Sequence, residues 1–300
     1  MKYPFIKDNS SGFSVERMAA VLNVSRSGYY TWLDRPRSSR EIENIRLDVE
    51  IKSVYERSQS RYGSVKITHE LVKRGKKYGR NRVASRMRKM GIASKVRKKF
   101  KATTHSKHTY PVAPNLLNRN FVVSAANEVW VSDITYIWTK SGWSYLAVFI
   151  DLFSRSVVGW AVSRSLSQEM VLEAFQNALW RRKPGKGLIV HSDRGVQYAC
   201  DEFRKTLKKN GFIQSMSRKG DCWDNAVAES FFKTVKTEWV YHVDFQDIHH
   251  VKREAFEYLE IFYNRERLHA TLAYQSPAEY EEKVYKKCAE LCVLFFGAIS

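Results

Sequence analysis

The sequence predicts an α/β domain with a mixed five-stranded sheet and flanking helices, preceded by an all-α helix-turn-helix region that is strongly basic. The charge distribution is the first observation behind this prediction. Residues 1–127 hold 28 Lys and Arg against 9 Asp and Glu, a net charge of +19, whereas residues 128–300 hold 23 against 22. The second observation is that, from residue 129 onward, β-branched and aromatic runs alternate with helical patterns, as in a sheet covered by helices.

Length and composition limit the function classes. The 300 residues suffice for two or three domains, and a hydrophobic content of 44% is ordinary for a globular protein. No apolar run approaches the roughly 18 residues of a membrane span, and the N-terminus lacks the apolar core of a signal peptide. We therefore expect a cytoplasmic protein with no membrane partner. No zinc-type spacing occurs among the four cysteines, which we expect to be reduced thiols: Cys200, Cys222, Cys288 and Cys292.

The first part of the basic half has a helix-turn-helix pattern between Phe13 and Leu33. Ser14 is a candidate N-cap, and Ser25 follows a short turn as the candidate cap of a second, aromatic-rich helix. Any helical hairpin gives a similar pattern, so a hairpin without a DNA role remains the alternative. Beyond a linker at 35–39, an amphipathic helix is predicted from four apolar positions: Ile42, Ile45, Val49 and Val54.

A second helical hairpin follows, in a region without acids between Glu70 and Glu128. Its apolar positions are Ile67, Leu71 and Val72 on one helix and Val83, Met87 and Met90 on the other. The remaining faces of the second helix are basic, and we expect them to contact DNA rather than only solvent. The residues predicted to bind DNA here and in the basic segment that follows are Arg82, Arg86, Arg88, Lys89, Arg97, Lys98 and Lys99. The next segment, 109–122, is predicted to be an extended linker.

The second half alternates strands and helices. Three strands in a meander are predicted first, then a helix, a strand, a helix, a strand and a long helix. The strands are predicted at 129–138, 143–153, 156–163, 187–191 and 213–217, and the helices at 167–182, 201–210 and 224–241.

Three carboxylates lie at informative places in this pattern. Asp133 is in the middle of the first strand, where a charge is costly unless it is paired or holds a metal. Asp193 lies 60 residues later at the end of the fourth strand, and Glu229 lies a further 36 residues on, in the last helix. Oxygen ligands suit Mg²⁺ or Mn²⁺, and phosphodiester chemistry commonly uses two such ions. We therefore expect the three side chains to form a two-metal site.

Other roles remain open for individual residues. Asp193 can be a turn residue, and Glu229 can be a surface glutamate paired with Lys233. His191 is expected to be a structural, hydrogen-bonded histidine. The rival acids Asp221 and Asp224 are expected in turn and helix-cap roles. On the last helix, one polar face is formed by Asn225, Glu229, Lys233 and Lys236.

Four segments carry a family resemblance: WVSDITYI, HSDRGVQY, SMSRKGDCWDNAVAESFFKTVKTE and YNRERLHATLAYQSPAEY. Their order and spacing over about residues 120–280 resemble the catalytic domain of retroviral-integrase-like DDE transposases, the second reading-frame products of bacterial insertion sequences. The resemblance implies a ribonuclease H-like fold. It also implies catalytic and metal-binding roles for Asp133, Asp193 and Glu229, and the family's basic residue at Lys236. His191 and Arg194 would position Asp193 or touch DNA, with Asn225 in support.

The resemblance also implies partners and a reaction. A homo-oligomer, at least a dimer on DNA, would bind the terminal inverted repeats and the target DNA. With two Mg²⁺ or Mn²⁺ ions it would cut the 3′ ends and transfer them, by way of a circular intermediate, in a bacterial cytoplasm at the nucleoid. A non-catalytic DNA-binding regulator of transposition is the alternative. The start of the pattern near Met1 suggests that an upstream frame encodes more of the DNA-binding apparatus.

The expected domain boundaries follow. They are 1–37 (helix-turn-helix), 38–108 (basic helical DNA-binding domain), 109–122 (linker), 123–283 (catalytic domain) and 284–300 (tail). The sequence departs from the family at the LGY triplet, where Ala273 replaces glycine. The apolar tail CAELCVLFFGAIS is expected to dock on the core or a partner chain, or to reflect a shifted reading frame.

Overall fold

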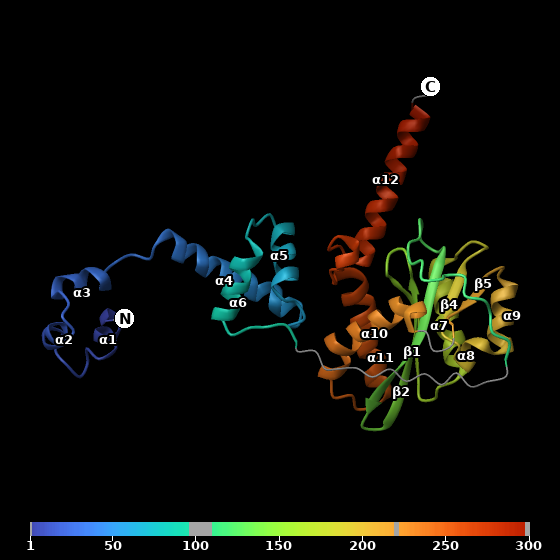
Figure 1. The fold of residues 1–300 in the computed structure, drawn as a ribbon, viewed down its shortest axis with the longest axis horizontal. Helices are drawn as coiled ribbons and strands as arrows, with labels where there is room; N and C mark the ends of the chain where they lie inside the picture. Colours follow the sequence, from blue (N-terminus) through green and yellow to red (C-terminus); the bar gives the residue numbers. More distant parts are fainter. Residues whose placement is uncertain (1, 96–109, 219–221, 298–300) are drawn as a thin grey trace. The chain divides into compact units, whose positions relative to one another are not determined.

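The computed structural model describes residues 2–95, 110–218 and 222–297, and the chain divides into two compact units, Met1–Ala93 and Ser94–Ser300 (Figure 1). Each unit has its own elements and core and is described by itself. Across the described residues, every helix is too short or too polar to span a lipid bilayer. Arg97, Lys98 and Lys99, predicted to bind DNA, lie outside the described residues.

The first helices of the N-terminal unit are α1 (Lys2–Asp8), α2 (Val15–Val21) and α3 (Arg26–Leu33). The predicted caps are confirmed, because Ser14 Oγ accepts from the Arg17 amide at 3.4 Å and Ser25 Oγ accepts from the Gly28 amide at 3.1 Å. The sequence did not predict α1. Its one buried residue, Ile6, packs with Met18 and Tyr29 to form a small apolar core.

The rest of the unit is formed by α4 (Ser39–Arg57), α5 (Ser64–Lys73) and α6 (Arg80–Lys89). The apolar face predicted for α4 is largely wrong: Ile42, Ile45 and Val49 are exposed, Val49 at 65%, and only Val54 is buried. The residues that α4 buries are Leu47, Ile51 and Val54. The reason is tertiary, because α5 and α6 pack on α4 and select which side of the helix is covered. On those two helices, Ile67, Leu71, Val83 and Met87 are buried as predicted, whereas Val72 is exposed.

The C-terminal unit is built on a five-stranded sheet in the order β3-β2-β1-β4-β5. Its strands are β1 (Val129–Thr139), β2 (Gly142–Asp151), β3 (Val157–Ser163), β4 (Ile189–Ser192) and β5 (Ile213–Met216). The first three strands are antiparallel, and β4 and β5 continue the sheet in parallel from β1. The predicted mixed sheet is therefore confirmed.

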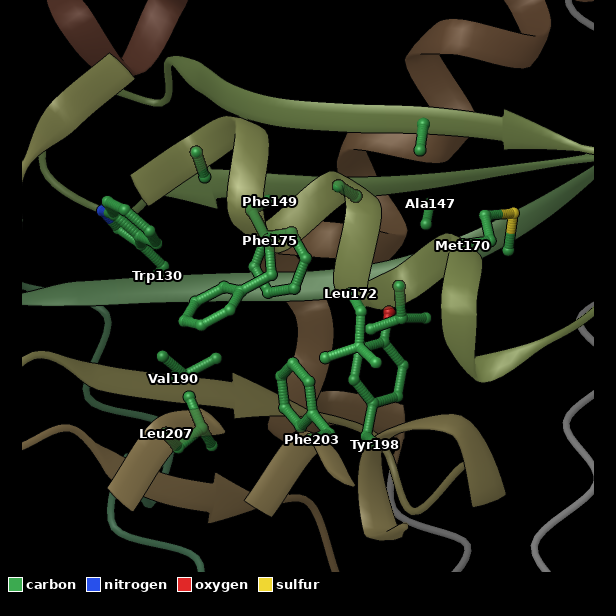
Figure 2. Close-up of a cluster of buried hydrophobic side chains, with 14 of the residues drawn as sticks. Trp130, Ala147, Phe149, Met170, Leu172, Phe175, Val190, Tyr198, Phe203 and Leu207 are labelled. Carbon is green, nitrogen blue, oxygen red and sulfur yellow. The ribbon is translucent and has the colours of Figure 1, made fainter. Parts of the chain in front are cut away.

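Helices cover both faces of this sheet. The first group is α7 (Gln168–Arg182), α8 (Val196–Ala199) and α9 (Asp201–Lys209). It closes a core that includes Phe149 of β2, Phe175 of α7 and Phe203 of α9 (Figure 2). Ring centroids in this cluster lie 5.2 Å apart for Phe149 and Phe175 and 5.4 Å apart for Phe175 and Phe203. Buried aromatic side chains thus fix α7 and α9 against the sheet.

Helix α10 packs on β1 on the other face, and further helical elements follow it along the chain. The elements are η1 (Cys222–Asn225), α10 (Ala226–Glu238), η2 (Val240–His242), α11 (Ile248–Phe256), the π-helical η3 (Glu257–Glu266), η4 (Ala270–Leu272) and α12 (Pro277–Gly297). The helix predicted at 224–241 is shorter, since irregular turns occupy both of its ends. Asn264 of η3 accepts from and donates to the backbone of Val157, both at 2.9 Å, which ties η3 to the start of β3.

The backbone turn at Ala273 is of a kind that favours the glycine which the resemblance implies at this position. Ala273 and Tyr274 have φ values of 51° and 58°, in the left-handed region that favours glycine. We expect Ala273→Gly to stabilise the protein by up to about 1 kcal/mol, because relief of strain exceeds the added entropy of the unfolded chain.

The measurement is the urea midpoint. Ala270→Gly, in the adjacent helical turn, is the control and is expected to lose about 0.5–1 kcal/mol. A loss of stability in Ala273→Gly comparable to that of the control would contradict the assignment of strain.

Candidate active site

Asp133 lies in the middle of β1, as predicted, and faces α10. It is paired across the antiparallel ladder with Val148, so the two side chains share one face of the sheet. Phe149, the next residue of β2, belongs to the core under α7 on the opposite face. Helix α10 packs on β1 from the Asp133 side, which brings the last helix to the first strand.

Burial and charge both act on Asp133. Burial raises the pKa of its carboxyl group well above the usual 3.8, and the negative charge of Asp193 raises it further. The charge of Glu229 adds a smaller increase, which Lys236 and the Ile134 amide oppose. The structure therefore brings these three predicted acids within electrostatic range of one another.

Asp193 follows the last residue of β4 and occupies a turn. Its Oδ1 accepts from the Gly195 amide at 2.9 Å, and a Cβ on Gly195 would lie 3.0 Å from the same oxygen. The turn role and a ligand role are thus compatible, because the turn fixes the direction of the carboxylate. Glycine at 195 leaves space beside Asp193 Oδ1 that a side chain would occupy.

His191 has the structural role that was predicted. Its side chain is fully buried, with Nδ1 2.8 Å from Ser215 Oγ and Nε2 3.2 Å from Ser217 Oγ. Burial lowers the pKa of the imidazole to about 4, so the ring is neutral at pH 7. Its hydrogen bonds join β4 to β5 and hold the strand end from which Asp193 projects.

Arg194 is held in a comparable way, since its Nε donates to the Ser217 carbonyl at 2.7 Å.

Glu229 lies on α10 and is partly buried. Burial raises the pKa of its carboxyl group. Within the described part of the chain, no ion pair joins Glu229 to Lys233, so the surface-pair alternative is not supported. Lys233 is exposed, whereas Lys236 is half-buried. Burial lowers the pKa of Lys236 and the charge of Asp133 opposes that shift, which places the ammonium group near the acids.

Asn225, just before α10, connects the helix to the strand. Its Nδ2 donates to the carbonyl of Ser132 at 3.4 Å, next to Asp133. Asn225 is 4% exposed, and its Oδ1 is buried with no hydrogen-bond partner among the described residues. An unsatisfied buried oxygen beside the acids is costly unless a further group supplies a donor or a positive charge.

The cap role predicted for Asp224 is wrong. Its side chain is fully buried and accepts 2.9 Å hydrogen bonds from the amide, Nε and Nη2 of Arg218. Arg119 adds a 3.3 Å contact. These hydrogen bonds hold the pKa of the Asp224 carboxyl group far below its usual value. The Asp224 carboxylate is therefore ionised and pairs with Arg218 and Arg119. Arg119 comes from the predicted linker, which also contacts β5 through a 2.9 Å hydrogen bond from the Leu116 amide to Ser215 Oγ. Asp221 lies outside the described residues.

Tyr198 is a site residue that the sequence did not indicate. Its hydroxyl lies 2.8 Å from Ser132 Oγ, and burial raises the pKa of the phenol, followed by the charges of Asp133 and Asp193. Burial also raises the pKa of the Tyr136 phenol, and Tyr145 and the charges of Asp133 and Asp193 increase it further. The only sequence signal was the position of Tyr198 five residues after Asp193, and its burial under α7 is a tertiary effect.

The donor set fits a divalent metal. Asp133 interacts electrostatically with the carboxylates of Asp193 and Glu229, and oxygen donors of this kind are those that Mg²⁺ and Mn²⁺ prefer. Among the described residues, no three Asp, Glu, His or Cys side chains lie close enough together to hold one ion. Repulsion of Asp193 and Glu229 on Asp133 is the force that a cation would relieve.

Asp133→Asn is expected to stabilise the metal-free protein at pH 7. The folded state raises the pKa of Asp133, so the ionised carboxylate destabilises the fold. This penalty is absent below pH 3.8, where the side chain is protonated in both states, and is complete above the raised pKa. The midpoint of urea unfolding, measured with EDTA and again with Mg²⁺, tests this.

We expect Mg²⁺ to raise the urea midpoint of wild type and so to reduce the difference in midpoint between wild type and Asp133→Asn. A variant less stable than wild type at pH 7 in EDTA would contradict the prediction.

The predicted DNA-binding side chains of α6 divide into two groups. Arg82 Nη2 lies 2.9 Å from Glu43 Oε2 and also binds Asn44, while Arg86 forms a two-point ion pair with Asp48 of α4. Hydrogen bonds to these acids raise the pKa of both guanidinium groups. Arg82 and Arg86 thus join α6 to α4, whereas Arg88 and Lys89 are exposed.

Comparisons with known proteins agree with this architecture. Models described as "Integrase core domain" match residues 123–222 and 210–277, and an "HTH-like domain" matches residues 41–100. The transposase InsF for insertion sequence IS3A of Escherichia coli (strain K12) is 40% identical over 285 residues, covering 94% of this chain and 99% of the relative. An uncharacterized 31 kDa protein of insertion element IS600 from Shigella sonnei is 42% identical over 272 residues, 91% and 100% of the two chains.

Solved structures that resemble the chain are integrase cores. The HTLV-2 integrase catalytic core domain in complex with magnesium (trimeric form) is 14% identical with a TM-score of 0.40, covering 52% of this chain and 96% of that one. The core of BIV integrase is 18% identical with a TM-score of 0.40, covering 54% and 98%. On the sequence identity to InsF and the integrase core matches, the chain belongs to the IS3-type insertion-sequence transposases, with an integrase core domain and an HTH-like helical region.

Proposed function

We propose that the chain binds the terminal inverted repeats of its insertion sequence and catalyses 3′-end cleavage and strand transfer. Asp133, Asp193 and Glu229 would hold two Mg²⁺ or Mn²⁺ ions for this reaction. The observation that carries the proposal is the position of Asp133 in the middle of β1, partly buried and within electrostatic range of the other two acids. Because the chain belongs to a family of transposases, we expect such a site to carry out phosphodiester chemistry.

The residues of the site have distinct tasks in this proposal. The ions, when bound, activate the attacking oxygen and stabilise the leaving oxygen of a phosphodiester. Asp133 and Asp193 supply carboxylates from fixed backbone, and Glu229 supplies one from α10. Lys236, half-buried beside Asp133, and the exposed Lys233 lie on the same side of α10 and would contact DNA phosphates.

The experiment is an assay of the full chain on labelled DNA that carries the element's ends, which are first identified as the DNA that the protein protects. Mg²⁺-dependent nicking at the 3′ end followed by joining to a second duplex supports the proposal. Binding with no cleavage in Mg²⁺ or Mn²⁺ supports a non-catalytic regulator of transposition instead. Cutting without joining indicates a simple nuclease.

The domain boundaries remain part of the proposal. Segments 1–37 and 38–108 would bind DNA, 109–122 would link them to the catalytic domain at 123–283, and 284–300 would form a tail. The division after Ala93 and the family matches at 41–100 and 123–222 support separate DNA-binding and catalytic parts. A homo-oligomer, at least a dimer, would be required to bring two DNA ends together.

Exposed and internally paired arginines of α6 should respond differently to substitution. Arg88→Met is expected to weaken DNA binding and lower the slope of log affinity against log salt by about 0.9, the value of one phosphate contact. Arg86→Met is expected to lower the stability of the N-terminal unit by about 1 kcal/mol, because its partner is Asp48.

Filter binding over a range of salt concentrations, with urea unfolding in parallel, separates the two effects. Equal losses of salt slope in both variants would contradict the division of these arginines into two groups.

A further inference from the structure

A cavity of about 300 Å³ lies beside α10. Ala226, Ser230 and Thr234, spaced four residues apart, line it along one stripe of the helix. Glu229 does not line the cavity. The cavity therefore belongs to the same helix as the candidate active site (α10 in Figure 1) and is distinct from that site.

The lining of the cavity is cationic and rich in hydroxyl groups. Arg155, Arg267 and His269 contribute nitrogen donors, and none of the lining residues is Asp or Glu. Hydroxyl groups come from Ser230 and Thr234 of α10 and from Thr271. Such a set of donors without acids favours an anion over a cation or a neutral apolar molecule.

Arg155 provides positive charge that the chain offsets only in part, through the charge of Asp151. It lies in the turn between β2 and β3 with φ of 62°, and its amide donates to the Asp151 carbonyl at 2.9 Å. Its Nη1 is buried with no hydrogen-bond partner, and no ion pair to Arg155 occurs among the described residues. A guanidinium group without an ion-pair partner, beside a cavity whose lining holds no acid, favours an acceptor from outside the chain.

Arg267 has a different role in the same wall. Its Nε and Nη2 each donate to the Glu238 carboxylate at 2.8 Å, so this ion pair is internally neutral. Its Nη1 lies 3.3 Å from His269 Nε2, which fixes the imidazole at the cavity. Arg267 thus forms part of the cavity wall. Arg155 is the cavity's arginine that forms no ion pair among the described residues.

We propose that this cavity binds a phosphoryl group, with Arg155 as its main ligand and the hydroxyl groups of Ser230 and Thr234 in support. Guanidinium groups donate to phosphate oxygens in a forked geometry, and hydroxyl groups complete the set of donors. The phosphoryl group can come from a DNA backbone or from a free phosphate compound. The site does not depend on metal binding by Asp133, Asp193 and Glu229.

Inorganic phosphate is the first probe, with the full chain and ionic strength held constant with chloride. Thr271 is exposed, so Thr271→Glu places a negative charge at the cavity without altering the core, and Thr271→Gln is its neutral control. Phosphate is expected to raise the melting temperature of wild type and of Thr271→Gln equally. Thr271→Glu is expected to bind phosphate at least about tenfold more weakly. Equal shifts in the two variants, or no shift in wild type, would overturn the proposal.

A short DNA duplex of arbitrary sequence is the second probe and distinguishes the sources. Arg155→Met removes the main ligand, and Arg204→Met removes an exposed positive charge from α9 as the control. A salt slope lowered by about 0.9 in Arg155→Met alone would identify a DNA phosphate as the occupant. An unchanged slope, with the phosphate-induced shift lost in Thr271→Glu, would identify a free phosphate compound.

Discussion

Asp193→Asn is expected to abolish Mg²⁺-dependent cleavage and joining while DNA binding persists. The substitution keeps the size of the side chain and the Oδ1 that accepts from the Gly195 amide at 2.9 Å, so the turn after β4 should survive. It removes one of the two negative charges that act on Asp133. Loss of a metal-binding charge is expected to lower the rate on the order of a thousandfold or more.

The control for this variant is Asp201→Asn, the same substitution at an exposed residue of α9 that pairs only with Arg204. Cleavage and joining are read on labelled terminal DNA in one gel, and binding is measured by filter retention with Ca²⁺ in place of Mg²⁺. We expect Asp201→Asn to match wild type in each assay. Wild-type joining by Asp193→Asn would remove this residue from the catalytic set, and lost binding would indicate a structural role.

The sequence predicted the elements of the catalytic unit because local patterns determine them. Runs of β-branched, aromatic and other apolar residues located the five strands, and the left-handed Gly211, with φ of 71°, follows α9 as a helix-ending glycine should. The positions of Asp133 and Asp193 followed from these strands. Their electrostatic proximity to Glu229 required the resemblance to a known family, because nothing local specifies that α10 packs on β1.

The errors have a common physical cause. Asp224 precedes a helix and therefore matches a cap, yet Arg119 from a segment more than a hundred residues away pairs with it. The exposed Ile42 of α4 belongs to a regular apolar pattern, yet burial depends on where α5 and α6 pack. Each case is a tertiary contact that local spacing does not contain.

Gly159→Ala is expected to cost about 3 kcal/mol of unfolding free energy, the largest effect on stability that we predict for one added methyl group. Gly159 lies in β3, buried where α7 crosses the sheet. A Cβ there would lie 2.3 Å from the Ala174 carbonyl oxygen and 2.6 Å from the Ala178 Cβ. The first neighbour is helix backbone, so relief requires α7 to move away from the sheet.

Movement of α7 would open the core that it closes. Phe175 of α7 contacts Phe149 and Phe203, so a displaced helix would loosen the packing under β1 and β4, the strands that position Asp133 and Asp193. The control is Gly185→Ala, where an added Cβ meets nothing within 4 Å, and its unfolding free energy is expected to change by at most about 0.5 kcal/mol. Urea unfolding followed by tryptophan fluorescence measures both variants. Equal stability of the two would show that α7 yields to the added methyl group without loss of packing, and that the approach at Gly159 does not set the distance between helix and sheet.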